Sequence, residues 1–186
     1  LGYPGKTERP ANDWLIADHH LCPAEQQIDS HERIARLSNC FLCYQPQPDA
    51  PDVAQPPSAK NGFITFGSFN HLAKLTDSTI RLWSRVLDAV PDSRLVLKAL
   101  PLADKETRDL TKRRFADCGI APTRIEPLPP TVPLSAFMAE YSRMDIALDT
   151  VPYNGGTTTC DALWMGIPVI TLPGGRFCSR MGASVL

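Results

Sequence analysis

Short apolar runs alternate with amphipathic stretches from about residue 61 to residue 186. Leu95–Leu97 and Ile146–Leu148 are continuous apolar runs, which are typical of strands covered on both faces. Phe63–Phe66 is rich in β-formers and runs into Gly67-Ser68, which predicts a strand that ends in a loop. Two further strands are predicted at 124–126 and 168–172.

Between these runs, apolar residues recur at the spacing of an α-helix. The first predicted helix starts at Asp77 as N-cap, stops before Pro91 and carries apolar residues at helical spacing: Ile80, Trp83, Val86, Leu87 and Val90. A charged helix is predicted from Lys105 to Cys118, with Gly119 as a left-handed cap. Further helices are predicted at 134–142, from Thr157 and after Ser179.

Regular alternation of strand and helix predicts an α/β fold with a Rossmann-like, doubly wound parallel sheet. In such a sheet, ligands bind outside the carboxyl ends of the strands, near helix N-termini. The loops that follow the strands are therefore the places to look for a functional site.

The chain before this pattern has a different composition. Residues 1–23 are turn-rich, with a short apolar stretch at Trp14–Ile16. A polar segment follows, and it becomes rich in proline: Pro46, Pro48, Pro51, Pro56 and Pro57. Because proline fixes φ and removes a hydrogen-bond donor, residues 24–60 are predicted to form an extended connecting segment.

Charge and hydropathy exclude several classes of partner. The 186 residues include 19 Lys and Arg and 20 Asp and Glu, a formal net charge of -1, so nothing favours nucleic acid or an anionic membrane. No apolar run approaches the ~20 residues that span a bilayer, and no signal-peptide pattern is present. We expect a cytoplasmic protein. The chain starts at Leu1 and stops at Leu186 inside a predicted helix, so we also expect a piece of a longer protein.

The six cysteines leave one metal alternative open. Only Cys40 and Cys43 form a C-x-x-C pair, and no second pair completes a zinc site. His31 and the Asp18-His19-His20 run lie nearby in the sequence. Reduced, partly buried thiols are the favoured interpretation, and a metal site built from these residues is the alternative.

The segment from Asp149 to Asp161 carries the strongest candidate chemistry. It leaves a predicted strand, crosses a loop with Gly155 and Gly156, and enters a helix. Glycines let backbone N–H groups approach an anion, and a helix start presents unpaired N–H groups and a partial positive charge. Hydroxyls gather at the same place: Thr157, Thr158 and Thr159. This combination predicts a diphosphate site.

Asp161 lies four residues after Thr157, on the same helix face and roughly 5–6 Å deeper. A carboxylate set back by that distance can accept hydrogen bonds from ribose hydroxyls. Ordinary capping is the alternative, because Thr and Asn are favoured N-caps and an early acid suits the helix dipole without any ligand.

Lys74 is a second candidate, in the loop after the first predicted strand. Loops at strand ends face one cleft in this fold, so its ammonium is a candidate contact for the diphosphate. A solvated surface lysine is the usual interpretation of a lone lysine at such a position.

These segments, taken together, resemble the catalytic region of the O-GlcNAc transferase and Spindly family, especially its bacterial members. The resemblance covers nearly the whole chain and is most specific between Asp145 and Pro173. It rests on blocks that occur in the family's order: Gly2-Tyr3-Pro4-Gly5, Phe69-Asn70-His71-Leu72-Ala73-Lys74, Ser93-Arg94-Leu95, Asp145–Thr150, Pro152–Cys160, Ala162–Val169 and Ser179-Arg180.

The resemblance implies a GT-B architecture, with two Rossmann-like lobes across a cleft, usually preceded by tetratricopeptide repeats. Residues 1–23 then end the N-terminal lobe, 24–60 connect the lobes, and 61–186 form most of the nucleotide-sugar-binding lobe. It also implies roles for individual residues: Lys74, Thr157 and Thr158 at the diphosphate, with Gly155 and Gly156 beside them, Asp161 at the ribose, His71 at the donor, and backbone groups near Val132 at the base.

Three positions depart from the family pattern. Phe137 stands where many members carry a histidine near the donor. Gly156 stands where the animal enzymes carry another histidine, and Glu140 replaces a base-contacting arginine of those enzymes. These changes leave the donor open between UDP-GlcNAc, which is favoured, and the GDP-fucose or UDP-glucose of relatives.

The favoured function is therefore an inverting transfer of a sugar to Ser or Thr hydroxyls of an acceptor protein. No Asp-x-Asp motif occurs, and the family implies chemistry without metal or cofactor, with Lys74 stabilising the leaving diphosphate. The family's catalytic histidine belongs upstream of Leu1, so this piece alone is expected to be inactive. The alternatives are O-fucosylation, N-glucosylation of Asn, and a nucleotide-binding module without catalysis.

Overall fold

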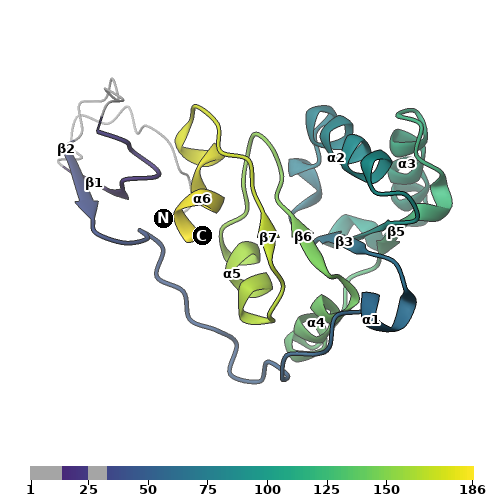
Figure 1. The fold of residues 1–186 in the computed structure, drawn as a ribbon. Coiled ribbons are helices and arrows are strands. Elements are labelled where there is room, and N and C mark those ends of the chain that lie inside the picture. The colour runs from purple at the N-terminus through teal and green to yellow at the C-terminus, as the bar shows by residue number, and fades with distance from the viewer. Residues whose placement is uncertain (1–13, 25–32) are drawn as a thin grey trace.

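A computed structural model describes residues 14–24 and 33–186. Its main body is a five-stranded, all-parallel sheet in the order β5-β4-β3-β6-β7 (Figure 1), which confirms the predicted α/β fold. The strands are β3 (Thr65–Ser68), β4 (Arg94–Lys98), β5 (Ile125–Leu128), β6 (Ile146–Leu148) and β7 (Val169–Ile170). The Gly2–Gly5 block and His31 lie outside the described residues.

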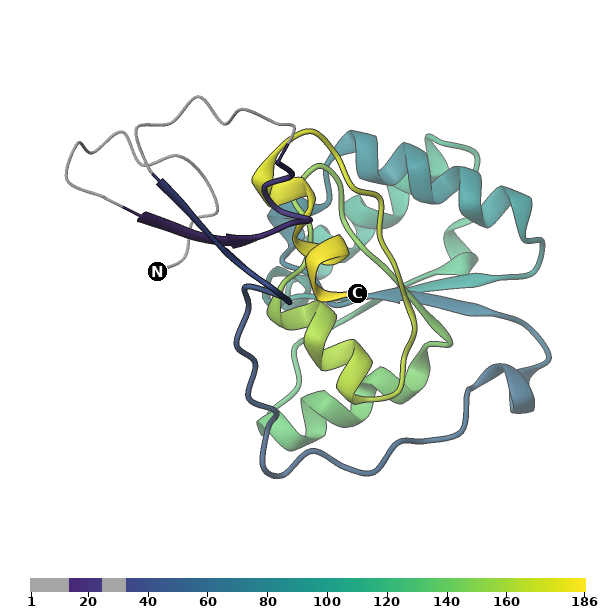
Figure 2. The ribbon, with the colours of Figure 1, turned by 60° about the vertical axis from the view of Figure 1, so that its left-hand side comes forward.

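Helices cover both faces of this sheet (Figure 2). Helices α2 and α3 lie on one face, and α4 and α5 on the other. The helix bounds are α1 (Ser58–Asn61), α2 (Asp77–Ala89), α3 (Lys105–Ala116), α4 (Leu134–Ala139), α5 (Thr157–Trp164) and α6 (Met181–Val185). Short 3-10 turns span Leu72–Lys74, Leu100–Ala103, Pro122–Arg124, Glu140–Arg143 and Phe177–Ser179.

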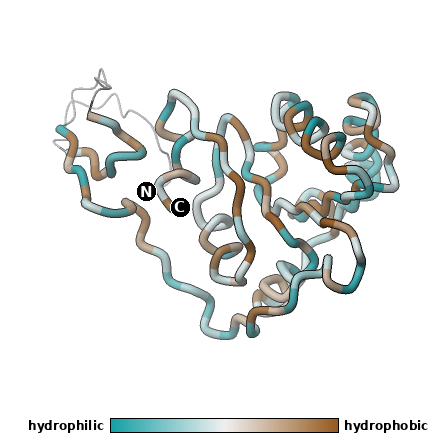
Figure 3. Tube along the Cα trace, in the orientation of Figure 1, coloured by the Kyte–Doolittle hydropathy of each residue, from teal (hydrophilic) through white to brown (hydrophobic). Residues whose placement is uncertain are grey.

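Strand β4 shows why its apolar run is continuous. Leu95 and Leu97 point into the core under α2 and α3, while Val96 points into the core under α4 and α5. All three side chains are at most 4% exposed. The hydropathy colouring in Figure 3 is also brown along strands β6 and β7.

The N-cap of helix α2 lies one residue before the predicted one. Thr76 is the N-cap, and its Oγ1 accepts a hydrogen bond from the Thr79 N–H at 3.2 Å. Asp77 is instead the first helical residue and forms an ion pair with Arg114 of α3 at 2.8 Å. The acid at this position suits the helix dipole without serving as the cap.

Strand β3 lies two residues later than the predicted strand. Gly67 pairs with both neighbouring strands and Ser68 pairs with β4, instead of forming a loop, because β3 occupies the centre of the sheet. Gly67 is required there, since a Cβ would lie 2.5 Å from the Met144 sulfur. The predicted strand at 168–172 shortens to two residues, and the helix at 134–142 ends in a 3-10 turn.

A second sheet, which the sequence pattern did not predict, pairs β1 (Trp14–Asp18) with β2 (Arg33–Leu37) in parallel. Asp18 joins this pair to α6, because its carboxylate accepts a hydrogen bond from the Ser184 hydroxyl. From β2 the chain runs without helix or strand to α1 along the lower edge of Figure 1.

In the described part of the chain, none of the helices combines the length with the apolar character that a membrane-spanning segment needs. In the same part of the chain, no three His, Cys, Asp or Glu side chains are grouped so that they could hold a metal ion. Cys40 and Cys43 are free thiols, and His31 of the candidate metal set lies outside the described residues.

Candidate functional site

Two loops meet at the carboxyl ends of β3 and β6. One contains Lys74 and the other runs from Asp149 to Gly156. The Lys74 ammonium donates a hydrogen bond to the Asn154 carbonyl at 2.8 Å. The structure thus brings Lys74 to the loop that precedes α5, although 80 residues separate the two partners in the chain.

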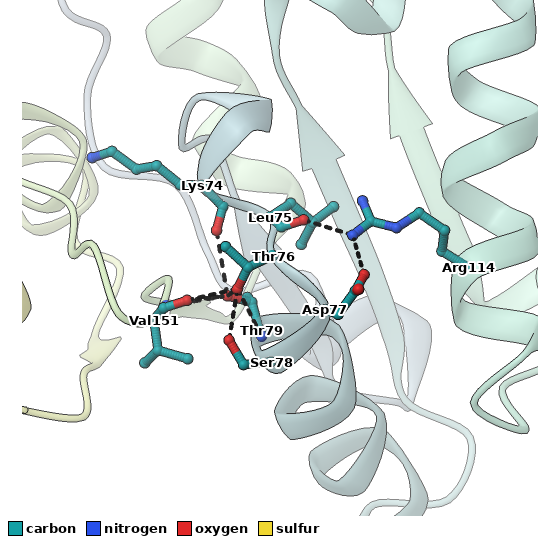
Figure 4. A network of polar contacts seen from close by, with 8 residues as sticks. All are labelled: Lys74, Leu75, Thr76, Asp77, Ser78, Thr79, Arg114 and Val151. Carbon is teal, nitrogen blue, oxygen red and sulfur yellow. Dashed lines mark hydrogen bonds and ion pairs between the residues drawn. The ribbon is translucent and has the colours of Figure 1, made fainter.

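Threonines fix the relative position of these loops. The hydroxyls of Thr76 and Thr79 donate to the Val151 carbonyl at 2.9 and 2.6 Å (Figure 4). Figure 4 also shows the Lys74 side chain extending away from this cluster. The start of α2 therefore anchors one loop against the other and leaves the ammonium at the loop edge.

The environment of Lys74 is partly desolvated. Burial lowers the pKa of its ammonium, and the nearby Asp149 carboxylate opposes that shift. The ammonium also lies 4.5 Å from the centre of the Tyr153 ring. An ammonium has three donors, and the Asn154 carbonyl takes one of them. The ammonium therefore has donors left for an anionic ligand. Its partial burial fits that role better than it fits the alternative of a solvated surface lysine.

Asp149 holds the loop from Asp149 to Gly156, called the glycine loop below, from inside the fold. Its carboxylate accepts hydrogen bonds from the Thr150 N–H at 2.8 Å, the Gly155 N–H at 2.6 Å and the Thr171 hydroxyl at 2.7 Å. Burial raises the pKa of this carboxyl, and these three hydrogen bonds oppose the shift. Sequence reasoning treated Asp149 only as the start of the loop and missed this role.

Helix α5 begins at Thr157 with Gly156 as its N-cap, and no side chain caps it. Among the described residues this argues against ordinary Thr or Asn capping, the alternative interpretation of the threonine cluster. Thr158 Oγ1 instead donates to Asn70 Oδ1 at 3.0 Å, whereas Thr157 is exposed. The helix start and the Lys74 loop are therefore in direct contact through Asn70.

Gly155 is a glycine because the loop closes tightly over α5. A Cβ there would lie 2.6 Å from Thr159 Oγ1 and 2.7 Å from Thr158 Oγ1. At Gly156, a Cβ would lie 3.0 Å from Met181 Cε. Gly155 thus permits a close approach of the backbone to two threonine hydroxyls, and Gly156 a close approach to the Met181 side chain.

Asp161 lies one turn into α5 and is 7% exposed. Its Oδ1 accepts a hydrogen bond from the Tyr44 phenol at 2.7 Å. Burial raises the pKa of the Asp161 carboxyl, and the Tyr44 hydrogen bond opposes that shift. Sequence reasoning identified Asp161 but not Tyr44, which comes from the segment before α1.

His71 and Val132 occupy different surroundings. His71 is exposed, and its Nδ1 accepts a hydrogen bond from the Ala73 N–H at 3.2 Å, so it caps the turn that carries Lys74. Val132 is 88% exposed on the loop after β5. Because the strands are parallel, this loop lies at the same edge of the sheet as the other two.

Lys98 supports the Val132 loop and was not identified from sequence. Its buried ammonium donates to the Pro129 carbonyl at 2.7 Å and to Thr131 Oγ1 at 2.6 Å. It also lies 3.7 Å from Glu140 Oε1. Burial lowers the pKa of Lys98, and Glu140 opposes the shift. Glu140 is thus paired with the lysine that holds this loop.

Phe137 packs into an aromatic cluster with Phe69 and Tyr141, with ring centroids 5.7 and 5.8 Å from its own. Its side chain therefore serves the core beneath α4 and supplies no polar group to the site. This accounts structurally for one of the three departures from the family pattern.

Comparison with known proteins places similar sequences in one family of glycosyltransferases. A family model described as glycosyl transferase family 41 matches residues 56–186. The SPINDLY proteins of Arabidopsis thaliana and Oryza sativa subsp. japonica, described as probable UDP-N-acetylglucosamine–peptide N-acetylglucosaminyltransferases, are 41% and 42% identical over 186 residues. The alignments cover 100% of this chain and 20% of each relative, so the chain spans about a fifth of their length.

A solved structure shows the same fold. A mutant O-GlcNAc transferase from Thermobaculum terrenum superimposes with a TM-score of 0.87 at 39% sequence identity. The match covers 95% of this chain and 33% of that one.

Proposed function

Because the chain belongs to glycosyltransferase family 41, we propose that it binds the nucleotide-sugar donor of a protein O-glycosyltransferase. The proposed reaction moves N-acetylglucosamine from UDP-GlcNAc to Ser or Thr hydroxyls of an acceptor protein, with inversion. The observation that carries this proposal is the contact of Lys74 with the glycine loop beside the uncapped start of α5.

The diphosphate is proposed to lie between the Lys74 ammonium and the first turn of α5. There it would meet a full positive charge, the partial charge of the helix start and the hydroxyls of Thr157 and Thr158. As the glycosidic bond breaks, negative charge grows on the leaving diphosphate, and groups already in place stabilise it. The proposed transfer therefore uses no metal, and the base that activates the acceptor comes from outside this chain.

The nucleoside is proposed to extend from the diphosphate toward Asp161 and the Val132 loop. Asp161 would accept hydrogen bonds from ribose hydroxyls. Backbone groups near Val132 would read the base, since Lys98 and Thr131 hold that loop in place and Glu140 is bound to Lys98. His71 is proposed to border the donor from the Lys74 turn.

The domain assignment follows the same proposal. Residues 61–186 form the nucleotide-sugar-binding lobe, residues 24–60 the connecting segment and residues 1–23 the end of a preceding lobe. Strand β2 falls inside the connecting range and pairs with β1, so the two segments share one sheet. A preceding lobe and tetratricopeptide repeats are the proposed partners in the parent protein.

Transfer assays on the parent protein test the proposal. Radiolabelled UDP-GlcNAc, GDP-fucose and UDP-glucose are supplied in turn with an acceptor protein extract, with and without EDTA. Label from UDP-GlcNAc on alkali-labile Ser or Thr linkages, insensitive to EDTA, is expected. Label from another donor alone would reassign the sugar. Binding of nucleotide without transfer from any donor would make the protein a binding module.

A further inference from the structure

We propose that Tyr44 is a positioning residue for the nucleoside: its phenol holds one oxygen of Asp161 so that the other oxygen faces the ribose. This rests on the proposed function, because it assumes that Asp161 receives the ribose. Tyr44 belongs neither to the glycine loop nor to the turn that carries Lys74. It comes from the segment before α1, 117 residues from Asp161 in the chain.

The two oxygens of Asp161 differ in their surroundings. Oδ1 accepts the Tyr44 hydrogen bond at 2.7 Å, whereas Oδ2 has no hydrogen-bond partner among the described residues. Asp161 as a whole is 7% exposed, but its Oδ2 is not fully buried, so a ligand can reach this oxygen. A carboxylate oxygen only accepts hydrogen bonds, so the group that fits Oδ2 is a donor such as a ribose hydroxyl.

The segment that carries Tyr44 is held at both ends. The Phe41 N–H donates to Asp18 Oδ2 at 3.0 Å, and the Ser58 N–H donates to Asp145 Oδ1 at 2.9 Å. Tyr44 itself is half-buried against α5. The phenol is therefore delivered to Asp161 by a segment whose position the surrounding fold already sets.

A phenol–carboxylate hydrogen bond is charge-assisted and directional. It restricts the rotation of the Asp161 side chain and so reduces the entropy lost when a ribose binds. It has no direct effect at the start of α5, where the phosphates are proposed to lie. Tyr44 should therefore influence ligands with ribose hydroxyls and leave phosphate-only ligands unaffected.

A purely structural role makes a different prediction. If Tyr44 only ties its segment to α5, loss of the phenol lowers the stability of the fold and weakens all ligands alike. Tyr44→Phe separates the two roles, because it keeps the ring and its packing and removes only the hydroxyl.

The test is calorimetry on the purified protein with three ligands: a nucleoside diphosphate, its dideoxyribose analogue and inorganic pyrophosphate. The nucleotide is UDP or GDP, whichever the wild type binds more tightly. Tyr44→Phe should weaken the nucleotide about five- to twentyfold and change the other two less than about twofold. Thr107→Val is the matched control, since it removes a hydroxyl-to-carboxylate bond to Asp104, 2.8 Å long, on α3.

Equal weakening of all three ligands by Tyr44→Phe, or no change in any, would overturn the inference. Asp161→Asn distinguishes this from failure of the proposed function. If Asp161→Asn selectively weakens the nucleotide while Tyr44→Phe is silent, the ribose site stands and only the Tyr44 role fails. If Asp161→Asn shows no selectivity for the nucleotide, the ribose assignment fails and takes the Tyr44 role with it.

Discussion

Replacing Asp149 tests how the fold holds the glycine loop. The side chain is 4% exposed, and its Oδ1 accepts both the Thr150 and Gly155 N–H groups. Its Oδ2 accepts the Thr171 hydroxyl. Asp149→Asn keeps an oxygen for the two N–H groups and presents an N–H₂ group to Thr171, whose hydroxyl can also accept. The hydrogen bonds are conserved and only the charge is lost.

Asp149→Ala removes every acceptor at this point. It leaves two buried backbone N–H groups unpaired, each costing about 1–3 kcal/mol, so the free energy of unfolding should fall by about 2–6 kcal/mol. Natural domains are stable by only about 5–15 kcal/mol, so the loss is large. Asp149→Asn should change the free energy of unfolding by less than about 1 kcal/mol, because it also relieves the burial of a charge.

Urea unfolding of the two variants and the wild type measures this difference. The midpoint should fall strongly for Asp149→Ala and stay near the wild-type value for Asp149→Asn. Nucleotide affinity, measured on folded protein, should follow the same order, because the loop that carries Gly155 loses its anchor only in the Ala variant. Equal midpoints for the two variants would refute the claim that hydrogen-bond acceptance, rather than charge, is what this loop requires.

Three further predictions concern the site. Lys74→Met should weaken UDP and pyrophosphate alike by about 10- to 100-fold in calorimetry, since it removes a charge from the diphosphate; a loss confined to UDP would contradict this. Lys98→Met should weaken UDP several-fold, on the order of the loss of one hydrogen bond, and spare pyrophosphate, because only the Val132 loop shifts. Asp161→Asn should gain stability over the wild type as pH rises from about 4 to 7. Burial raises the Asp161 pKa, so the folded wild type holds its proton longer than the unfolded chain and loses stability as that proton leaves. A urea midpoint difference that does not vary with pH would exclude this.

The secondary structure was largely readable because its signals are local. The run at Ile146–Leu148 became β6 without a shift, and the helix expected from Thr157 begins there. Where the prediction missed, a distant neighbour was responsible. Gly67 looks like a loop residue in sequence, but Met144 and two flanking strands hold it in the centre of the sheet.

The candidate site divides in the same way. Glycines and threonines after a strand, and a lysine in another strand-end loop, follow a known spatial rule for parallel sheets, so Lys74 and Gly155 could be singled out. Tyr44 and Lys98 could not be singled out in this way. Their hydrogen-bond partners lie far away in the chain, and no local spacing of residues indicates such a pairing. The pairing of β1 with β2 was missed for the same reason.

The sequence by itself therefore determined the parallel α/β architecture and the loop at which a diphosphate is proposed to bind. Only the tertiary structure decided which polar groups are already occupied. It commits Asp149 to the loop backbone and pairs Glu140 with Lys98, and it leaves one oxygen of Asp161 without a partner in the part of the chain that the structure describes. The physical reason is that periodicity and turn chemistry act over a few residues, whereas hydrogen-bond satisfaction depends on groups that meet only after the chain has folded.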